Sequence, residues 1–144
     1  MTSFAFVVLL FTVSVMHPVL AAEQFDAIAE IARRSGLPEQ EVAHRLLDCS
    51  ANQQSMYFCA WRDLVVAEDK LKQRVSPVSQ QSKDCADKTS AQLAAWFKKR
   101  DAICQRDAAR AVGGGSDEPR QRVACEASMT DDYAQHFDEI AGCQ

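Results

Sequence analysis

The stretch LAAWFKKRDAICQRDAARAVGGGSDEPRQRVAC, residues 93–125, decides the fold. Its first part places apolar residues at helical intervals, three glycines interrupt it, and Pro119 then opens a second helical pattern. Cys104 lies before the interruption and Cys125 after it. Because a short glycine turn brings two helices together antiparallel, this stretch predicts a helical hairpin that a disulfide can close.

The rest of the chain predicts further helices and no strand, because no run alternates apolar and polar residues for long enough. Gly36 and Pro38 separate two short N-terminal helices, and Ser50 or Asn52 can cap the next one. The sequence VSPVS around Pro77 interrupts the pattern again. We expect helices at residues 24–34, 38–49, 53–74, 87–110 and from 119 onward. The expected fold is all-α, with the last three helices forming the core and the first two an N-terminal hairpin.

The segment 1–22 predicts export. Residues 4–16 (FAFVVLLFTVSVM) form an uninterrupted apolar run, and Pro18 and the small pair Ala21-Ala22 follow it, as in a Sec-type signal peptide. The alternative is an uncleaved membrane anchor, but the run is shorter than the roughly 20 residues that span a bilayer. We therefore expect a signal peptide, a periplasmic or secreted location, and no stable membrane association after cleavage.

All six cysteines follow this segment, and an even number in an exported chain indicates three disulfides. A zinc site is the alternative, but no C-x2-C pair is present and His44 and His136 stand alone, so we expect no metal and no cofactor. No redox C-x-x-C or catalytic histidine accompanies the cysteines, which favours structural bridges over reactive thiols.

Six cysteines allow fifteen pairings, and the sequence alone does not choose among them. Bridged Cα atoms must lie within about 7 Å, which excludes pairs held apart by a continuous helix. The pairs that this geometry favours are Cys104–Cys125 across the glycine turn, Cys49–Cys59 across the polar break at 50–55, and the remaining Cys85–Cys143.

The chain resembles the LprI-type lysozyme-inhibitor domain, a small cysteine-containing domain of bacterial envelope proteins. The resemblance extends over residues 49–137 and rests on an ordered string. Its first half shows Cys49, Met56-x-x-Cys59-Ala60 and Ala67-Glu68-x-x-Leu71, and its second half shows Ala95-Trp96-x-x-x-Arg100-Asp101-Ala102-x-Cys104, Gly114-Gly115, Cys125 and Met129-Thr130. The chain departs from the family pattern at several positions, for example at Tyr57, where an asparagine is usual. The implied organisation is an extension at residues 23–48 followed by an LprI-like domain at residues 49–144.

The motif residues of the second half have two interpretations. Trp96 and Arg100 lie four residues apart on one helical face, where the guanidinium can stack on the indole. The structural interpretation, which covers Trp96, Arg100, Asp101, Gly114 and Gly115, is favoured over direct contact with a partner.

No Ser/His/Asp order, phosphate loop or glycosidase carboxylate pair is present, so we expect a binding protein and not an enzyme. The resemblance implies a lysozyme inhibitor. Residues 123–144 carry five acids and no base, and animal-type lysozymes are generally basic, so an acidic surface could steer their encounter. The candidate partner surface is Glu126, Asp131, Asp132, Asp138 and Glu139. The alternatives are a solvated helix face and a disulfide-stapled structural or accessory envelope protein without inhibiting activity.

A nucleic-acid partner is not expected. Ala32, Gly36 and Val42 have the spacing of a helix-turn-helix, but any two helices packed across a glycine turn share it. Residues 23–48 carry six acids against three arginines, and the formal net charge of the whole chain is −4.

Overall fold

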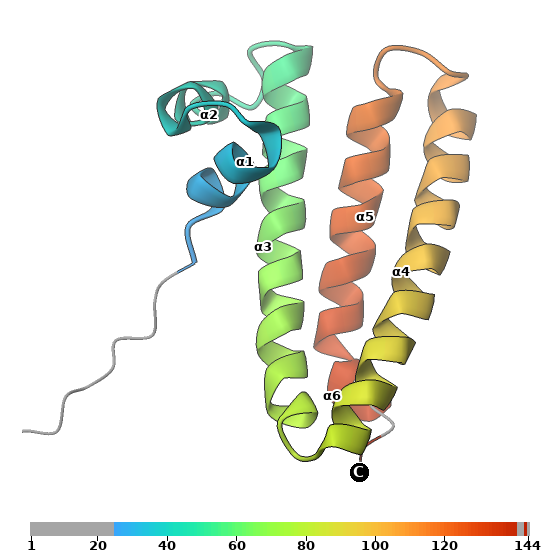
Figure 1. Cartoon of the computed structure of the whole chain (residues 1–144). Coiled ribbons are helices and arrows are strands. Elements are labelled where there is room, and N and C mark those ends of the chain that lie inside the picture. The colour runs from blue at the N-terminus through green and yellow to red at the C-terminus, as the bar shows by residue number, and fades with distance from the viewer. Residues whose placement is uncertain (1–24, 141–142, 144) are drawn as a thin grey trace, which may run out of the picture.

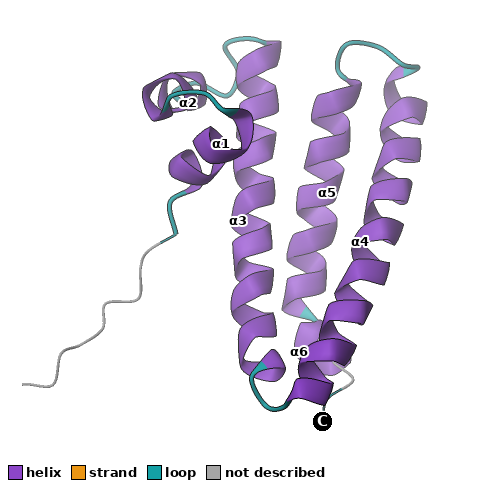
Figure 2. Ribbon diagram, in the orientation of Figure 1, coloured by secondary structure: helices purple, strands orange, loops and turns teal. Residues whose placement is uncertain are grey.

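Three long helices lie side by side, and a short helical hairpin packs against one of them (Figure 1). The computed structural model describes residues 25–140 and Cys143, and this part of the chain contains helices and no strand (Figure 2). The helices are α1 Ala27–Ser35, α2 Glu39–Leu46, α3 Gln53–Ser79, α4 Lys83–Val112, α5 Glu118–Gln135 and α6 Phe137–Ile140. The all-α prediction is confirmed. The predicted signal peptide lies outside the described residues.

Three helices begin where a polar side chain closes the first turn. Asn52 and Ser82 each accept the backbone N–H three residues further on, at 2.9 and 3.1 Å, at the starts of α3 and α4. Asp26 caps α1 in the same way. Each such cap contributes about 1 kcal/mol to stability. Ser50, the other predicted cap of α3, instead donates its N–H and its hydroxyl to Asp48.

The third helix is longer than predicted. We expected it to end near Arg74, but α3 continues through Pro77 to Ser79. A proline inside a helix removes one backbone hydrogen bond, so side-chain packing must offset the stability that is lost. Val75 and Val78 pack against the apolar core on either side of the proline. Because tertiary packing supplies most of the stability of a protein helix, these contacts carry α3 past the interruption.

Two other boundaries also differ from the prediction. The fourth helix begins at Lys83 and not near Asp87, because Ser82 caps it. The second helix ends at Leu46 and does not reach Cys49. Leu47, which we had placed within that helix, lies in the following loop and is 80% exposed.

The core consists of three apolar clusters, and α3 contributes to each of them. Their buried members are Ile31, Val42, Phe58 and Val65 in the first, Leu64, Val123 and Ala127 in the second, and Leu71, Ala134 and Phe137 in the third. The first cluster fastens α1 and α2 to α3, so the hairpin belongs to the same packed body as the bundle. The division of the chain after residue 48 stays a prediction.

Three disulfides hold the loops and the C-terminal segment. Cys49–Cys59 closes the α2–α3 loop, Cys104–Cys125 ties α4 to α5, and Cys85–Cys143 ties the C-terminal segment to the start of α4, with Cα atoms 5.7, 5.5 and 5.6 Å apart. These are the pairs that helix geometry favoured, and none of the described cysteines is free. A disulfide typically contributes about 2–4 kcal/mol. No described helix combines the length and the hydropathy that a bilayer span requires.

Candidate functional site

Arg100 lies at the centre of the bundle and is 6% exposed. Its guanidinium carbon lies 4.8 Å from the centroid of the Phe97 ring and 5.6 Å from that of Trp96. The guanidinium donates to the Thr130 hydroxyl of α5 at 2.9 Å and pairs with Asp101 at 2.8 Å. Burying a charged group costs several kcal/mol unless it is paired and hydrogen-bonded. The structure therefore brings Trp96, Arg100 and Asp101 together in one interhelical contact.

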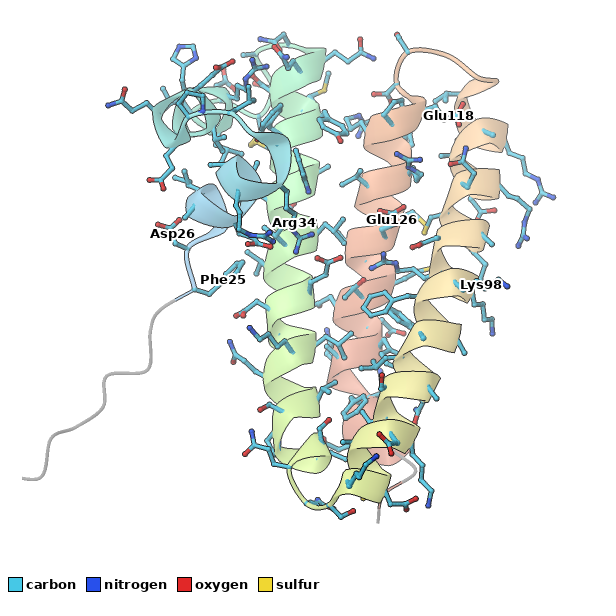
Figure 3. All side chains as sticks on the ribbon, in the orientation of Figure 1. Phe25, Asp26, Arg34, Lys98, Glu118 and Glu126 are labelled. Atoms are coloured by element: carbon cyan, nitrogen blue, oxygen red, sulfur yellow. A yellow bond between two sulfur atoms is a disulfide. The ribbon has the colours of Figure 1, made fainter. Side chains whose placement is uncertain are left out.

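A chain of ion pairs extends from Arg100 to the hairpin. Glu68 of α3 lies 3.5 Å from Arg100 and accepts a hydrogen bond of 2.7 Å from Arg34, which lies between α1 and α3 (Figure 3). Arg34 in turn donates to Glu30 at 2.6 Å. Hydrogen bonds from Arg33, and then from Arg34, outweigh the opposing effect of burial and lower the pKa of Glu30 to about 2. Charges of α1, α3 and α4 are thus paired in one line, which fixes the hairpin on the bundle.

Glu126, predicted as part of an acidic partner surface, is largely covered by its neighbours. Only 13% of its side chain is exposed, and burial raises its pKa although Arg100 and Arg122 oppose that rise. The Arg122 Nε lies 3.8 Å from the Glu126 carboxylate. A side chain this covered offers little area to a partner, and the predicted partner surface stays a prediction. The side chain of Glu139 is not among the described ones.

The remaining predicted acids are largely paired with bases of α3. Asp131 accepts from Lys70 at 2.7 Å, and Asp138 lies 3.2 Å from Arg74. Asp132 is 78% exposed. Exposed pairs contribute little to stability, but they neutralise the local charge. The structure therefore places Asp131, Asp132 and Asp138 on the outer side of the bundle without making one continuous unpaired acidic face.

The glycines of the α4–α5 turn have a backbone role. Gly113 ends α4 with φ 60°, and Gly114 follows with φ 76°, a region that residues with a side chain rarely adopt. A Cβ atom on Gly115 would lie 3.1 Å from the Val112 carbonyl oxygen. Gly114 and Gly115 thus shape the turn that sets α5 beside α4, as the sequence indicated.

The turn at residues 113–117 and the α2–α3 loop at residues 47–52 lie at the same end of the bundle, and we call them together the loop end (Figure 1). The α2–α3 loop is held at several points. The Cys49–Cys59 disulfide closes it, and the Asp48 carboxylate accepts from the Ser50 N–H at 2.8 Å and from its hydroxyl at 2.6 Å. These hydrogen bonds lower the pKa of Asp48, so it carries its charge at neutral pH.

The loop end also presents apolar groups to solvent. Leu47 is 80% exposed and Met56, one turn into α3, is 36% exposed. A shallow pocket lies between the first turns of α3 and α5, and a groove runs from the Cys49–Cys59 disulfide along α3 and α5 to Asp131. The pocket is lined by Asn52, Gln53, Gln54, Tyr57, Phe58, Ser116, Pro119 and Arg120. The loop end therefore presents both apolar and polar groups, on a backbone whose conformation is already fixed before any partner binds.

Sequence analysis missed Leu47 as a candidate contact. Its position in an apolar series suggested a buried helical residue. The available signal was its position two residues before Cys49, because a disulfide to Cys59 forces the chain out of helix there.

These features define a class of protein: a small helical bundle, stapled by disulfides, with a preformed loop surface. The described residues contain no group of three or more histidine, cysteine, aspartate or glutamate side chains that could hold a metal ion. The family model described as lysozyme inhibitor LprI matches residues 48–137, and the chain belongs to this family. The matched region begins at the α2–α3 loop and includes all of α3, α4 and α5. No curated protein and no solved structure matches the chain.

Proposed function

We propose that this protein is an exported inhibitor of a lysozyme. The observation that carries the proposal is membership of the LprI family over residues 48–137. The disulfides support export, because bridges persist in oxidising compartments outside the cytosol. The apolar segment at residues 4–16 supports it as well. A periplasmic or secreted location follows from this proposal.

The loop end is the surface best suited to contact the enzyme. Tight inhibition requires a contact surface whose conformation is fixed before binding, since ordering a loop on binding costs affinity. The disulfide, the Asp48 hydrogen bonds and the Asn52 cap provide that order in the α2–α3 loop. Leu47 supplies an apolar side chain that binding would bury, and Asp48 supplies a negative charge toward a basic enzyme.

The direct test is an inhibition assay with the oxidised protein recovered from the periplasm of an expression host. Lysis of bacterial cell walls by an animal-type lysozyme is followed by turbidity while the protein is titrated, and affinity is measured in parallel at several salt concentrations. We expect saturable inhibition that weakens as salt screens the charges. The matched control is the same preparation after reduction and alkylation. Absence of both inhibition and low-salt binding would contradict the proposal.

The alternative is a structural or accessory protein of the cell envelope. It is favoured by one observation: the acids predicted as a partner surface are paired with bases of the protein itself, as in Lys70–Asp131 and Arg74–Asp138. The same assay separates the two functions, because a structural protein would leave lysozyme activity unchanged at every concentration.

A further inference from the structure

The outer face of α4 carries a row of bases that the fold does not use. Lys98, Lys99, Arg106 and Arg110 are all exposed, and we call them the cationic stripe. Lys99, Arg106 and Arg110 are spaced by nearly whole helical turns, so they lie on one side of α4, and Lys98 adjoins them. Figure 3 shows Lys98 pointing away from the bundle. The stripe extends over about 18 Å at 1.5 Å per residue.

The charges of the stripe are largely uncompensated. In the described part of the chain no carboxylate lies within 4.0 Å of Lys98, Lys99 or Arg106, and Arg110 meets only Asp107, at 4.0 Å. The bases at the other end of the same helix differ, because Lys83 and Lys88 pair with acids of α4 at 2.6 and 2.7 Å. Positive potential is therefore concentrated on the half of α4 nearer the glycine turn.

The surface around the stripe carries small and polar residues. Ala95 and Ala102 are exposed beside the bases, as are Asp101, Gln105 and Asp107, and no α4 residue lines the pocket or the grooves along α1, α3 and α5. The exposed large hydrophobic residues among those described, Phe25, Leu47 and Met56, lie on other elements. Such a face has no cavity for a small ligand and no large apolar side chain to anchor one. Several of its charges can, however, contact a planar surface at the same time.

We infer that the cationic stripe docks the protein reversibly on an anionic phospholipid bilayer. Each base near such a surface contributes about as much as a fivefold change in partition coefficient. The stripe has no aromatic side chain on which nucleotide bases could stack, which favours a lipid surface over a single-stranded polyanion. This contact is peripheral and sensitive to salt, unlike the membrane anchor that the sequence argued against.

The orientation that results leaves the rest of the molecule accessible. The hairpin packs on α3, on the side of the bundle away from α4 (Figure 1). Residues 25–48 carry five acids and three arginines, so an anionic surface repels this side while it attracts the stripe. The bundle would lie with α4 along the membrane and the hairpin facing away from it.

The test is sedimentation of the oxidised protein with vesicles of phosphatidylglycerol or phosphatidylcholine, in about 20 mM salt and again in about 500 mM salt, between which the Debye length falls several-fold. We expect binding only to phosphatidylglycerol and only in low salt. One variant replaces the four stripe bases with glutamine. A control variant of the same net charge replaces four bases of α1 and α3: Arg33, Arg62, Lys72 and Arg74.

The stripe variant should lose roughly a hundredfold in partition coefficient or more, and the control should stay within about twofold to threefold of the native protein. Circular dichroism and the absence of free thiols establish that both variants are folded. Three results would each overturn the inference: no sedimentation of the native protein with phosphatidylglycerol, equal losses in both variants, or tighter binding to double-stranded DNA than to the vesicles.

Discussion

The loop end and the cationic stripe differ in what they offer a partner. At the loop end, a disulfide and side-chain hydrogen bonds fix the backbone, and Leu47 adds an exposed apolar group. On α4 the backbone is an uninterrupted helix, and the exposed groups of the stripe are long, flexible bases with small and polar residues between them. The first surface can select a partner by shape and the second only by charge. Mutations and salt should therefore affect lysozyme inhibition and vesicle binding differently.

Both surfaces depend on the contact that the buried Arg100 makes between the long helices, and the largest effect should come from removing its side chain. Arg100→Ala removes the guanidinium that pairs with Glu68 and Asp101, and it leaves the partly buried Glu68 without this interaction. We expect a loss of about 3–5 kcal/mol in unfolding free energy, measured by urea denaturation of the oxidised protein. Inhibition and vesicle binding should both fall wherever the variant is partly unfolded.

The matched control for this variant is Lys99→Ala, one residue earlier on the same helix and exposed. A surface truncation of this kind should change the unfolding free energy by no more than about 0.5 kcal/mol. If Arg100→Ala cost as little as Lys99→Ala, the buried Arg100 side chain would not be what holds α4 against α3 and α5.

Removing the bridge of the α2–α3 loop should affect one surface and spare the other. The double change Cys49→Ala with Cys59→Ala should lower stability by about 2–3 kcal/mol and weaken lysozyme inhibition at least about tenfold, because the loop is no longer ordered before binding. Vesicle binding should be unchanged. The matched control removes Cys85–Cys143 at the opposite end; it should lower stability and leave inhibition unaltered. Equal inhibition by the two variants would show that the loop is not the contact surface.

Local signals in the sequence account for much of the fold. A capping residue before the third helix and the glycines after the fourth each act on the backbone next to them, so Asn52 could be named beside Ser50 as a cap, and the glycines could be named as a turn. Cys49–Cys59 and Cys104–Cys125 could be paired because short breaks bring these residues together, and Cys85–Cys143 was the pair that remained. Pro77 misled for the same reason: its local effect is to stop a helix, and the packing of Val75 and Val78 that overrides it is not visible in the sequence.

The ion pairs and exposed groups of the candidate site were harder to predict, because they depend on contacts between residues that are distant in the sequence. Asp131 and Lys70 are 61 residues apart, and Arg34 and Glu68 are 34 apart, so no spacing rule pairs them. The sequence shows that the C-terminal segment is acidic, but it does not show that Lys70 and Arg74 of α3 pair with Asp131 and Asp138. Leu47 became exposed because α2 stops one residue earlier, a boundary that periodicity alone does not resolve.

A smaller effect should come from truncating one exposed side chain of the loop end. Leu47→Ala should weaken inhibition about tenfold by removing the apolar group that the enzyme would bury, with no measurable change in thermal stability. Phe25→Ala is the control, since Phe25 is also exposed but precedes α1, away from the loop. Inhibition constants for the three proteins in one lysozyme assay provide the comparison. A loss of inhibition in Phe25→Ala but not in Leu47→Ala would show that the contact surface lies on the hairpin and not at the loop end.

The smallest effect concerns how firmly the hairpin is held. The pKa of Glu30 is lowered to about 2 from an ordinary value of 4.5, first through Arg33, so its pairing stabilises the folded state fully above about pH 4.5 and is lost as the pH falls toward 2. Because Arg33 is largely exposed, the pairing contributes about 1 kcal/mol to the free energy of unfolding. Urea denaturation at pH 6 should show Glu30→Gln less stable than the native protein by that amount, and the difference should vanish near pH 2. Arg33→Gln should reproduce part of it. A difference that persists at pH 2 would mean that Glu30 acts through packing on α3 and not through its charge.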